Sequence, residues 1–235
     1  MAIMKGILPV CSAALLAGTA FAQMPQSAQD RPAFSAQPQQ APVYDPNQLP
    51  AFNGRIQQFT LSPRGEIDGF ILADGTEVKT PPHLSTQIAV TLHPGDAVTV
   101  HGLHAAAIPL IEATSLTNDA SGQSVVDYGP PRPPKGLGWW DRGPGQATLQ
   151  GRVRMTLHGP KGDVNGALLE DGAVVRMPPP AAERFASLLA PGQTIAVQGD
   201  MTSTPLGRVI DAMAIGGSQA TLNPIGGPGA RRARP

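Results

Sequence analysis

Five histidines are the residues of this sequence best suited to bind a metal, and four of them lie close together along the chain. His101 and His104 are three residues apart, with His83 and His93 upstream. Imidazole nitrogens are common zinc ligands, but this spacing matches no compact ligand motif. A second stretch of the chain aligns with this one at an offset of 97 residues. At the positions equivalent to the four histidines it carries Pro180, Ala190, Gln198 and Met201. We therefore expect no metal, with a weak site at His101 and His104 as the alternative.

Two short loops and one aromatic pair are the candidates for ligand binding. The loops contain Arg64-Gly65-Glu66 and Lys161-Gly162-Asp163, so a basic residue, a glycine and an acidic residue recur in the same order. The alternative for each loop is a solvated turn whose ion pair contributes little. Trp139 and Trp140 are the only tryptophans. They are expected either to dock a partner groove or a saccharide face, or to fold back and fill a gap between two domains.

No known catalytic motif is present in the sequence. The nucleophile elbow, the zinc-protease helix, the phosphate-binding loop and the dinucleotide fingerprint are all absent. No set of serine, histidine and aspartate recurs between the two repeated stretches. We therefore expect no enzyme and no cofactor.

The elements that must position these residues occur twice. Residues 54–102 align without a gap on residues 151–199, with 17 identities in 49 positions. The identities are mostly glycine, proline and apolar residues, which form turns and core. A repeat of this length indicates two copies of one domain, since solenoid repeats have shorter periods.

Each copy shows the same order of strand and helix signals. In the first copy, strands are expected at 54–61, 69–72, 76–80, 97–102 and 109–116, with a helix at 83–92 that buries Leu84, Ile88 and Leu92. Asp74-Gly75 predicts a type I′ hairpin turn. Pro81-Pro82 is expected to end the third strand and begin the helix. In the second copy, Asp171-Gly172 and Pro178-Pro179 take these places, and Phe185 and Leu188 or Leu189 point inward.

This order, β-β-β-α-β-β, predicts an all-β protein with short helices, built as two tandem OB-like five-stranded Greek-key barrels joined by a Pro/Gly-rich linker. The stretch GFILADGTEVKTPPHL followed by HPGDAVTVHG resembles the tandem OB-fold proteins exported by proteobacteria. The resemblance covers both repeats and implies binding without catalysis. The first loop of an OB barrel takes part in holding ligands, which is why residues 64–66 and 161–163 are the first candidates.

The ends and the composition restrict location and partners. Lys5, the apolar run at 6–17 and Ala20-Phe21-Ala22 are typical of a secretory signal peptide cleaved after Ala22, and the run is short for a membrane anchor. Cys11 is the only cysteine, so the mature chain has none. These features favour a periplasmic or secreted protein without a transmembrane segment. Without Lys5 the chain has 16 basic and 17 acidic residues, and aromatic residues make up 4% of the whole sequence. We therefore expect no nucleic acid partner.

The domain organisation and the function follow from these observations. The expected segments are a signal peptide (1–22), a disordered Pro/Gln-rich tether (23–50), a first OB-like domain (51–118), a linker (119–148), a second OB-like domain (149–217) and a disordered basic tail (218–235). The predicted function is an exported, non-enzymatic binding or assembly module that recognises a protein or a small polar ligand in the periplasm. The alternative is a small-molecule or metal sensor that uses the histidines of the first domain.

Overall fold

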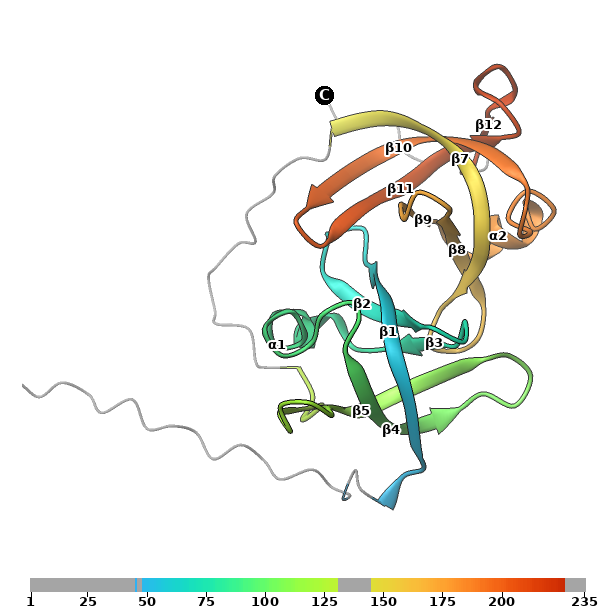
Figure 1. Cartoon of the computed structure of the whole chain (residues 1–235). Helices are drawn as coiled ribbons and strands as arrows, with labels where there is room; N and C mark the ends of the chain where they lie inside the picture. The colour runs from blue at the N-terminus through green and yellow to red at the C-terminus, as the bar shows by residue number, and fades with distance from the viewer. Residues whose placement is uncertain (1–44, 46–47, 131–144, 227–235) are drawn as a thin grey trace, which may run out of the picture. The chain divides into compact units, whose positions relative to one another are not determined.

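The computed structural model describes residues 45, 48–130 and 145–226, and strands dominate it (Figure 1). The first half contains β1 (Ala51–Leu61), β2 (Ile67–Leu72), β3 (Glu77–Lys79), the 3₁₀-helix η2 (Pro82–Leu84), α1 (Ser85–Thr91), β4 (Ala97–His104), β5 (Leu110–Asn118) and β6 (Ser124–Val126). The second half contains β7 (Gly145–His158), β8 (Val164–Leu169), β9 (Val174–Arg176), α2 (Pro179–Arg184), β10 (Thr194–Thr204), β11 (Gly207–Gly216), the 3₁₀-helix η3 (Gln219–Thr221) and β12 (Asn223–Pro224).

Each half closes into a five-stranded barrel. β1 pairs with β4 through Ala51–Arg55 and with β2 through Ile56–Leu61, so one long strand serves two neighbours. β2 pairs with β3, β3 lies parallel to β5, and β5 pairs with β4, which completes the ring. β7, β8, β9, β11 and β10 repeat this ring in the second half. The predicted pair of OB-like barrels is confirmed, and we call them the first and the second barrel.

The short helices lie where the sequence places them. Leu84, Ile88 and Leu92 are buried in the first barrel, as the spacing of four predicts. Pro81 and Pro178 are extended residues at the helix N-termini, and the prolines that follow them begin the helices. Proline suits a first helical turn because its missing N–H has no partner there. The interpretation of both proline pairs as strand ends and helix starts is therefore confirmed.

The predicted hairpin turn is present, but its type is different. Gly75 N donates to Leu72 O at 2.9 Å, so Ala73 and Asp74 are the central residues of the turn and Gly75 follows them with φ +89°. A type I′ turn would centre on Asp74 and Gly75. Asp74 instead accepts a hydrogen bond from Thr76 N, and Asp171 does the same for Ala173 N in the second barrel. A positive φ after a turn of this kind matches the three-residue hairpin loop that ends in a glycine bulge.

Two short strands lie in segments that were expected to be linker and tail. β6, inside residues 119–148, pairs with β5 through Ser115–Thr117. β12, inside residues 218–235, pairs with β11, and Ile225 beside it is buried. At the end of the expected tether, Pro50 O accepts a hydrogen bond from Gly102 N. The ordered barrels therefore extend beyond the repeat on these sides.

The two barrels belong to one compact unit and share buried apolar side chains. In β8, Ala167 and Leu169 pack in the core of the second barrel, whereas Leu168 between them joins the core of the first. This division is expected because successive side chains of a strand point to opposite faces. The side chains of the second barrel that join the core of the first in this way are Leu157, Leu168, Val174 and Val209.

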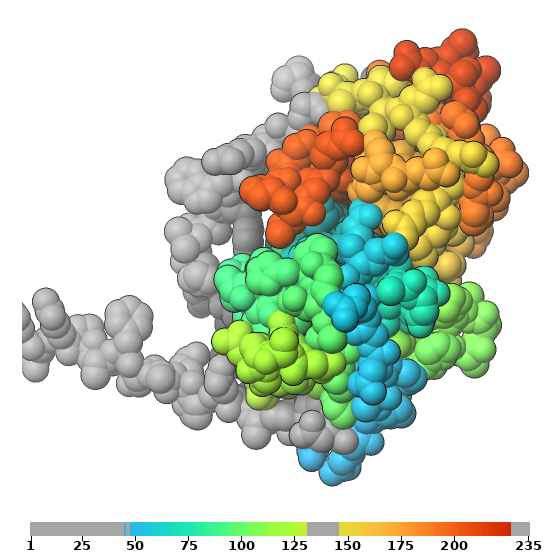
Figure 2. All heavy atoms as spheres, in the orientation of Figure 1, coloured from blue at the N-terminus to red at the C-terminus, as the bar shows by residue number. Residues whose placement is uncertain are grey.

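These shared side chains stabilise the contact between the barrels. All four are at most 1% exposed, and burying one aliphatic side chain fully contributes about 1.5–3 kcal/mol. Together they contribute roughly 6–12 kcal/mol as an upper bound, which is comparable with the whole stability of an ordinary domain. In the space-filling view, the blue and green atoms of the first barrel meet the yellow and orange atoms of the second (Figure 2).

Candidate functional site

The two barrels are related by an approximate two-fold axis that passes through their contact. Arg154 donates a hydrogen bond to the Oε1 atom of Gln57, and these residues occupy equivalent positions of the repeat, 97 residues apart. Equivalent residues touch one another only near a two-fold axis, as in a symmetric homodimer. The contact is thus made by the same face of both barrels, the one formed by the first three strands of each.

A network of buried charges lies in this contact. Arg176 is 4% exposed, and its Nη2 atom lies 2.6 Å and 2.8 Å from the two carboxylate oxygens of Asp68 in the other barrel. Its remaining donors reach Leu61 O at 3.0 Å and Asn165 Oδ1 at 2.8 Å. A buried guanidinium requires hydrogen-bond acceptors for its nitrogen atoms, because an unpaired charge away from water is strongly destabilising.

A second ionic group adjoins the first. Lys79, the repeat equivalent of Arg176, donates to Glu77 Oε1 at 3.1 Å and lies 4.0 Å from Asp68 Oδ1. The second oxygen of Glu77 accepts hydrogen bonds from His158 N at 3.0 Å and His158 Nδ1 at 3.2 Å. Glu77 and Lys79 are almost completely buried. The two barrels are therefore joined by two adjoining groups of ionisable side chains.

The surroundings shift two pKa values in this network. Burial opposes ionisation of Glu77, but the hydrogen bonds from His158 and the charge of Lys79 outweigh it, so the pKa of Glu77 lies below its ordinary value. Burial lowers the pKa of Lys79, and the nearby Arg176 charge lowers it further, against the opposing effect of Asp68 and Glu77. Both shifts follow from placing charges between two barrels.

The first loops, which are the predicted ligand loops, lie at the edge of the same contact. Pro63 O accepts a hydrogen bond from Thr202 Oγ1 at 3.1 Å. Gly65 is buried, and a Cβ atom built on it would lie 2.9 Å from Cγ2 of Thr204. In the other direction, the nearest atom to a Cβ on Gly162 is Cδ1 of Ile108, at 3.5 Å. Each first loop thus adjoins the hairpin between the last two strands of the opposite barrel.

The contact between the barrels covers the surface with which OB barrels ordinarily bind ligands. OB barrels bind ligands on the face of their second and third strands, between the first loop and the loop joining strands four and five. In this protein, Asp68 on β2, Lys79 on β3 and Arg176 on β9 occupy that face in the barrel contact. A ligand can therefore reach only the outer parts of these loops or another surface.

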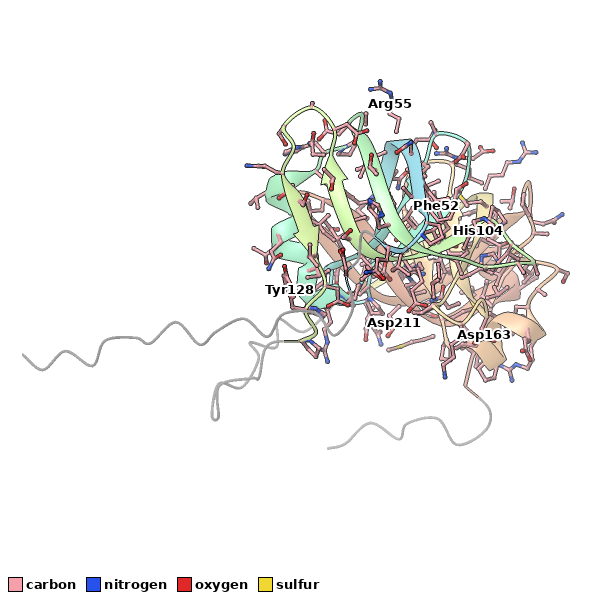
Figure 3. All side chains as sticks on the ribbon, turned by 90° about the horizontal axis from the view of Figure 1, so that it is seen from below. Phe52, Arg55, His104, Tyr128, Asp163 and Asp211 are labelled. Carbon is pink, nitrogen blue, oxygen red and sulfur yellow. The ribbon has the colours of Figure 1, made fainter. Side chains whose placement is uncertain are left out.

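Two exposed cations remain on the outer parts of the loops. Seven of the nine basic residues in the described part of the chain donate a hydrogen bond: Arg55, Lys79, Arg152, Arg154, Arg176, Arg184 and Arg208. Within residues 48–130 and 145–226, Arg64 and Lys161 have no such partner, and both are exposed. They occupy equivalent positions of the repeat. Glu66 is half-buried and accepts a hydrogen bond from Ser62, and Asp163 is exposed (Figure 3).

The histidines considered for metal binding have different neighbours in the structure. His83 lies 2.9 Å from Asp127 Oδ1, and His101 Nδ1 lies 3.1 Å from Leu49 O. His104 stands beside Phe52, with ring centroids 5.8 Å apart (Figure 3). The described residues contain no group of three or more His, Cys, Asp or Glu side chains that could hold a metal ion. The alternative of a histidine-based sensor gains no support.

Several predicted features lie outside the described residues. They include Trp139 and Trp140, the signal peptide and the arginines near the C-terminus. Among the residues that the structure describes, no helix is both long and apolar enough to cross a membrane.

Sequence reasoning missed the barrel contact, although a signal for it exists. Ala167-Leu168-Leu169 and Ala173-Val174-Val175 are apolar on both strand faces, as are Phe70-Ile71-Leu72. An uninterrupted apolar run is typical of a strand that is buried on both sides. A barrel strand needs only one buried face, so these runs predict a second packing surface outside the barrel.

Solved structures of another protein are weakly similar to this chain. No family model and no curated protein matches the chain. Two solved structures of the single-stranded DNA binding protein from Thermus aquaticus are similar to it. A deletion variant has 15% identity and a TM-score of 0.24, and the match covers 71% of this chain and 91% of the other. The wild-type protein has 14% identity and a TM-score of 0.23, with 78% and 95% covered. The strand pairing of its two closed barrels defines the chain as a two-barrel protein of the OB class.

The comparison corrects one expectation. We expected no nucleic acid partner, on the grounds of balanced charge and few aromatic residues. The similar solved structures are single-stranded DNA binding proteins, so that exclusion is wrong. Overall composition is a weak ground for excluding a partner, because a binding surface depends on a few local side chains and not on the average of the chain.

Proposed function

We propose that this protein is a binding module that presents Arg64 and Lys161, one from each barrel, to a polar partner carrying anionic groups. The observation that carries the proposal is that these two cations are exposed and have no hydrogen-bond partner within the described residues. An exposed cation with free donors can form charge-assisted hydrogen bonds to carboxylate or phosphate. Their equivalent positions in the repeat support one function for both loops.

The shared core supports this proposal by holding the two loops on one compact unit. Both first loops adjoin the contact between the barrels, through Thr202 in one case and Ile108 in the other. Sites held on rigid elements lose less conformational entropy on binding than sites on separate, mobile domains. A partner that contacts both loops therefore gains from the association of the barrels.

The test measures binding of two labelled anionic probes by fluorescence anisotropy. One probe is a single-stranded oligonucleotide of about 30 nucleotides, since one OB barrel covers roughly 4–16. The other is an oligoglutamate peptide. We expect at least one probe to bind, and the double variant Arg64→Ala/Lys161→Ala to weaken it roughly tenfold or more, as two charge-assisted bonds are lost. For the oligonucleotide, the salt slope should fall by about 0.7 per lost phosphate contact.

The matched control is Arg208→Ala, which removes an exposed cation that is already paired with Asp171 at 2.9 Å. This variant should bind as the wild type does. The proposal fails if neither probe binds, or if the loop variant and the control are affected equally.

We also propose that the protein acts outside the cytoplasm after cleavage at Ala22, on the basis of the N-terminal sequence. Expression with the native N-terminus in a Gram-negative host, followed by mass spectrometry of the periplasmic fraction, should give a chain that begins at Gln23. An uncleaved chain retained in the cytoplasm would contradict export.

A further inference from the structure

We propose that the surface joining the barrels also fits a second copy of this chain, so that two chains can exchange barrels and form a closed dimer. In such a dimer, the first barrel of each chain packs on the second barrel of the other. The inference rests on the barrel contact alone and is independent of the binding role of Arg64 and Lys161.

The first support is the self-complementary geometry of the contact. Gln57 and Arg154 are equivalent residues and contact each other, which places them near the approximate two-fold axis. The loops also contact the opposite barrel reciprocally, Pro63 with Thr202 and Gly162 with Ile108. A homodimer has this arrangement, so the face of a first barrel fits that of a second barrel whichever chain supplies it.

The second support is the cost of an unpaired barrel. Without a partner, Leu168 and Val174 would be exposed to water, and Arg176 would lose Asp68 and Leu61 O. An isolated barrel therefore pairs with the first complementary face that it meets during folding. Within one chain, the effective concentration of the partner barrel is about millimolar for a flexible connection, so intramolecular pairing prevails at lower protein concentrations.

The buried charges determine which barrels pair. In a contact between two second barrels, Arg176 would face Asn165, the repeat equivalent of Asp68, and would lose its carboxylate. In a contact between two first barrels, Glu77 would face Leu61, the equivalent of His158, and would lose the hydrogen bond from the imidazole, which a leucine side chain cannot supply. Only the pairing of a first with a second barrel satisfies both groups. Reciprocal exchange between two chains forms both groups of contacts at each of two barrel contacts, which closes the dimer.

The decisive experiment is a charge-reversal complementation in the full chain. One variant carries Asp68→Lys and the other Arg176→Glu, so each alone opposes like charges in its own barrel contact. When the two are unfolded together and refolded at about 10 µM, the exchanged dimer pairs the new lysine with the new glutamate, and Asp68 with Arg176. We expect a species of twice the chain mass by light scattering, containing one isotopically labelled and one unlabelled chain.

The control is the double variant Asp68→Lys/Arg176→Glu in one chain, which restores unlike charges within the molecule and should refold as a monomer. If this control folds and the mixture still yields only monomers, the proposal is overturned.

A second measurement needs no substitution in the contact. Wild-type protein is refolded from urea at about 1 µM, far below the effective concentration of the partner barrel, and at about 1 mM, which is comparable with it. We expect dimer only at the higher concentration, and we expect it to persist after dilution to 1 µM because exchange requires the barrels to separate. A chain that is monomeric at both concentrations, or a dimer that dissociates at once on dilution, contradicts barrel exchange.

Discussion

Arg176 and Asp68 form the most strongly constrained pair of side chains in the described structure. The guanidinium is buried and bound to the carboxylate, a carbonyl and an amide oxygen, whereas Asp68 also accepts a hydrogen bond from Thr60 Oγ1 at 2.8 Å. A buried ion pair contributes little compared with apolar residues of the same shape, but removing one partner leaves the other charge unpaired. The pair therefore specifies how the barrels meet more than it stabilises them.

Asp68→Ala should accordingly be among the most damaging single substitutions. We expect the free energy of unfolding to fall by about 3–5 kcal/mol, because Arg176 stays buried without its carboxylate. Asp68→Ala/Arg176→Met should recover much of this loss, since no charge is then left behind. Arg208→Ala, which breaks the exposed pair with Asp171, should cost at most about 1 kcal/mol. Urea unfolding measures all three, and equal losses for Asp68→Ala and Arg208→Ala would contradict the buried-pair argument.

Glu77 should make stability depend on pH in the acid range. Its pKa is lower in the folded protein than in the unfolded chain, so its contribution is complete above the unfolded value, about 4.3, and is lost as the pH falls through the lowered value. Glu77→Gln should therefore flatten the loss of stability below about pH 4.3. Glu112→Gln on the exposed face of β5 should leave the wild-type profile unchanged.

Lys79 should make stability depend on pH in the alkaline range, because burial opposes its charged form. Its pKa is also lowered, so between the lowered and the ordinary value the unfolded chain binds more protons, and stability rises with pH. Lys79→Met should remove that rise. Unfolding curves between pH 7 and 10.5 measure it, and an unchanged slope in Lys79→Met would show that the ammonium is not desolvated as described.

At the scale of elements, the sequence predicted the strands inside the repeat and missed the short strands outside it. The five strands and the helical segment of the first barrel were predicted within a few residues, because turn glycines, proline pairs and apolar periods occur twice. β6 and β12 have three and two residues, too few to show a period, and pairing with β5 and β11 alone gives them their structure. The turn type was wrong because Asp-Gly suits more than one hairpin loop.

Helix α1 provides an element-scale prediction with an internal control. Ile88 is fully buried under the barrel, whereas Val90 on the same helix is 72% exposed. Ile88→Ala should lower the free energy of unfolding by about 2–5 kcal/mol, as expected for loss of a buried aliphatic side chain. Val90→Ala should change it by less than about 0.5 kcal/mol. Similar effects of the two substitutions in urea unfolding would show that α1 does not close the barrel.

For the whole molecule, duplication provided two equal barrels and later divergence made them unequal. Asp68 and Lys79 correspond to Asn165 and Arg176, and Glu77 corresponds to Val174. The sequence showed the duplication but not the contact, because these differences resemble ordinary surface variation until the two faces are placed together. The first loops stay the predicted ligand site. They occupy equivalent positions of the repeat, but the sequence alone could not show that Thr202 and Thr204 of the opposite barrel lie against Pro63 and Gly65.

A shared core predicts that both barrels unfold in one transition. Ile88 belongs to the first barrel, yet Ile88→Ala should lower the urea midpoint for the second barrel by the same amount, because losing one barrel exposes Leu168 and unpairs Arg176 in the other. Hydrogen exchange at increasing urea measures this through the amides of Val98 in β4 and Ile195 in β10, both fully buried. Coincident loss of protection supports one cooperative unit. If Ile195 stays protected where Val98 has exchanged, the second barrel is stable alone, and the contact is weaker than its buried area implies.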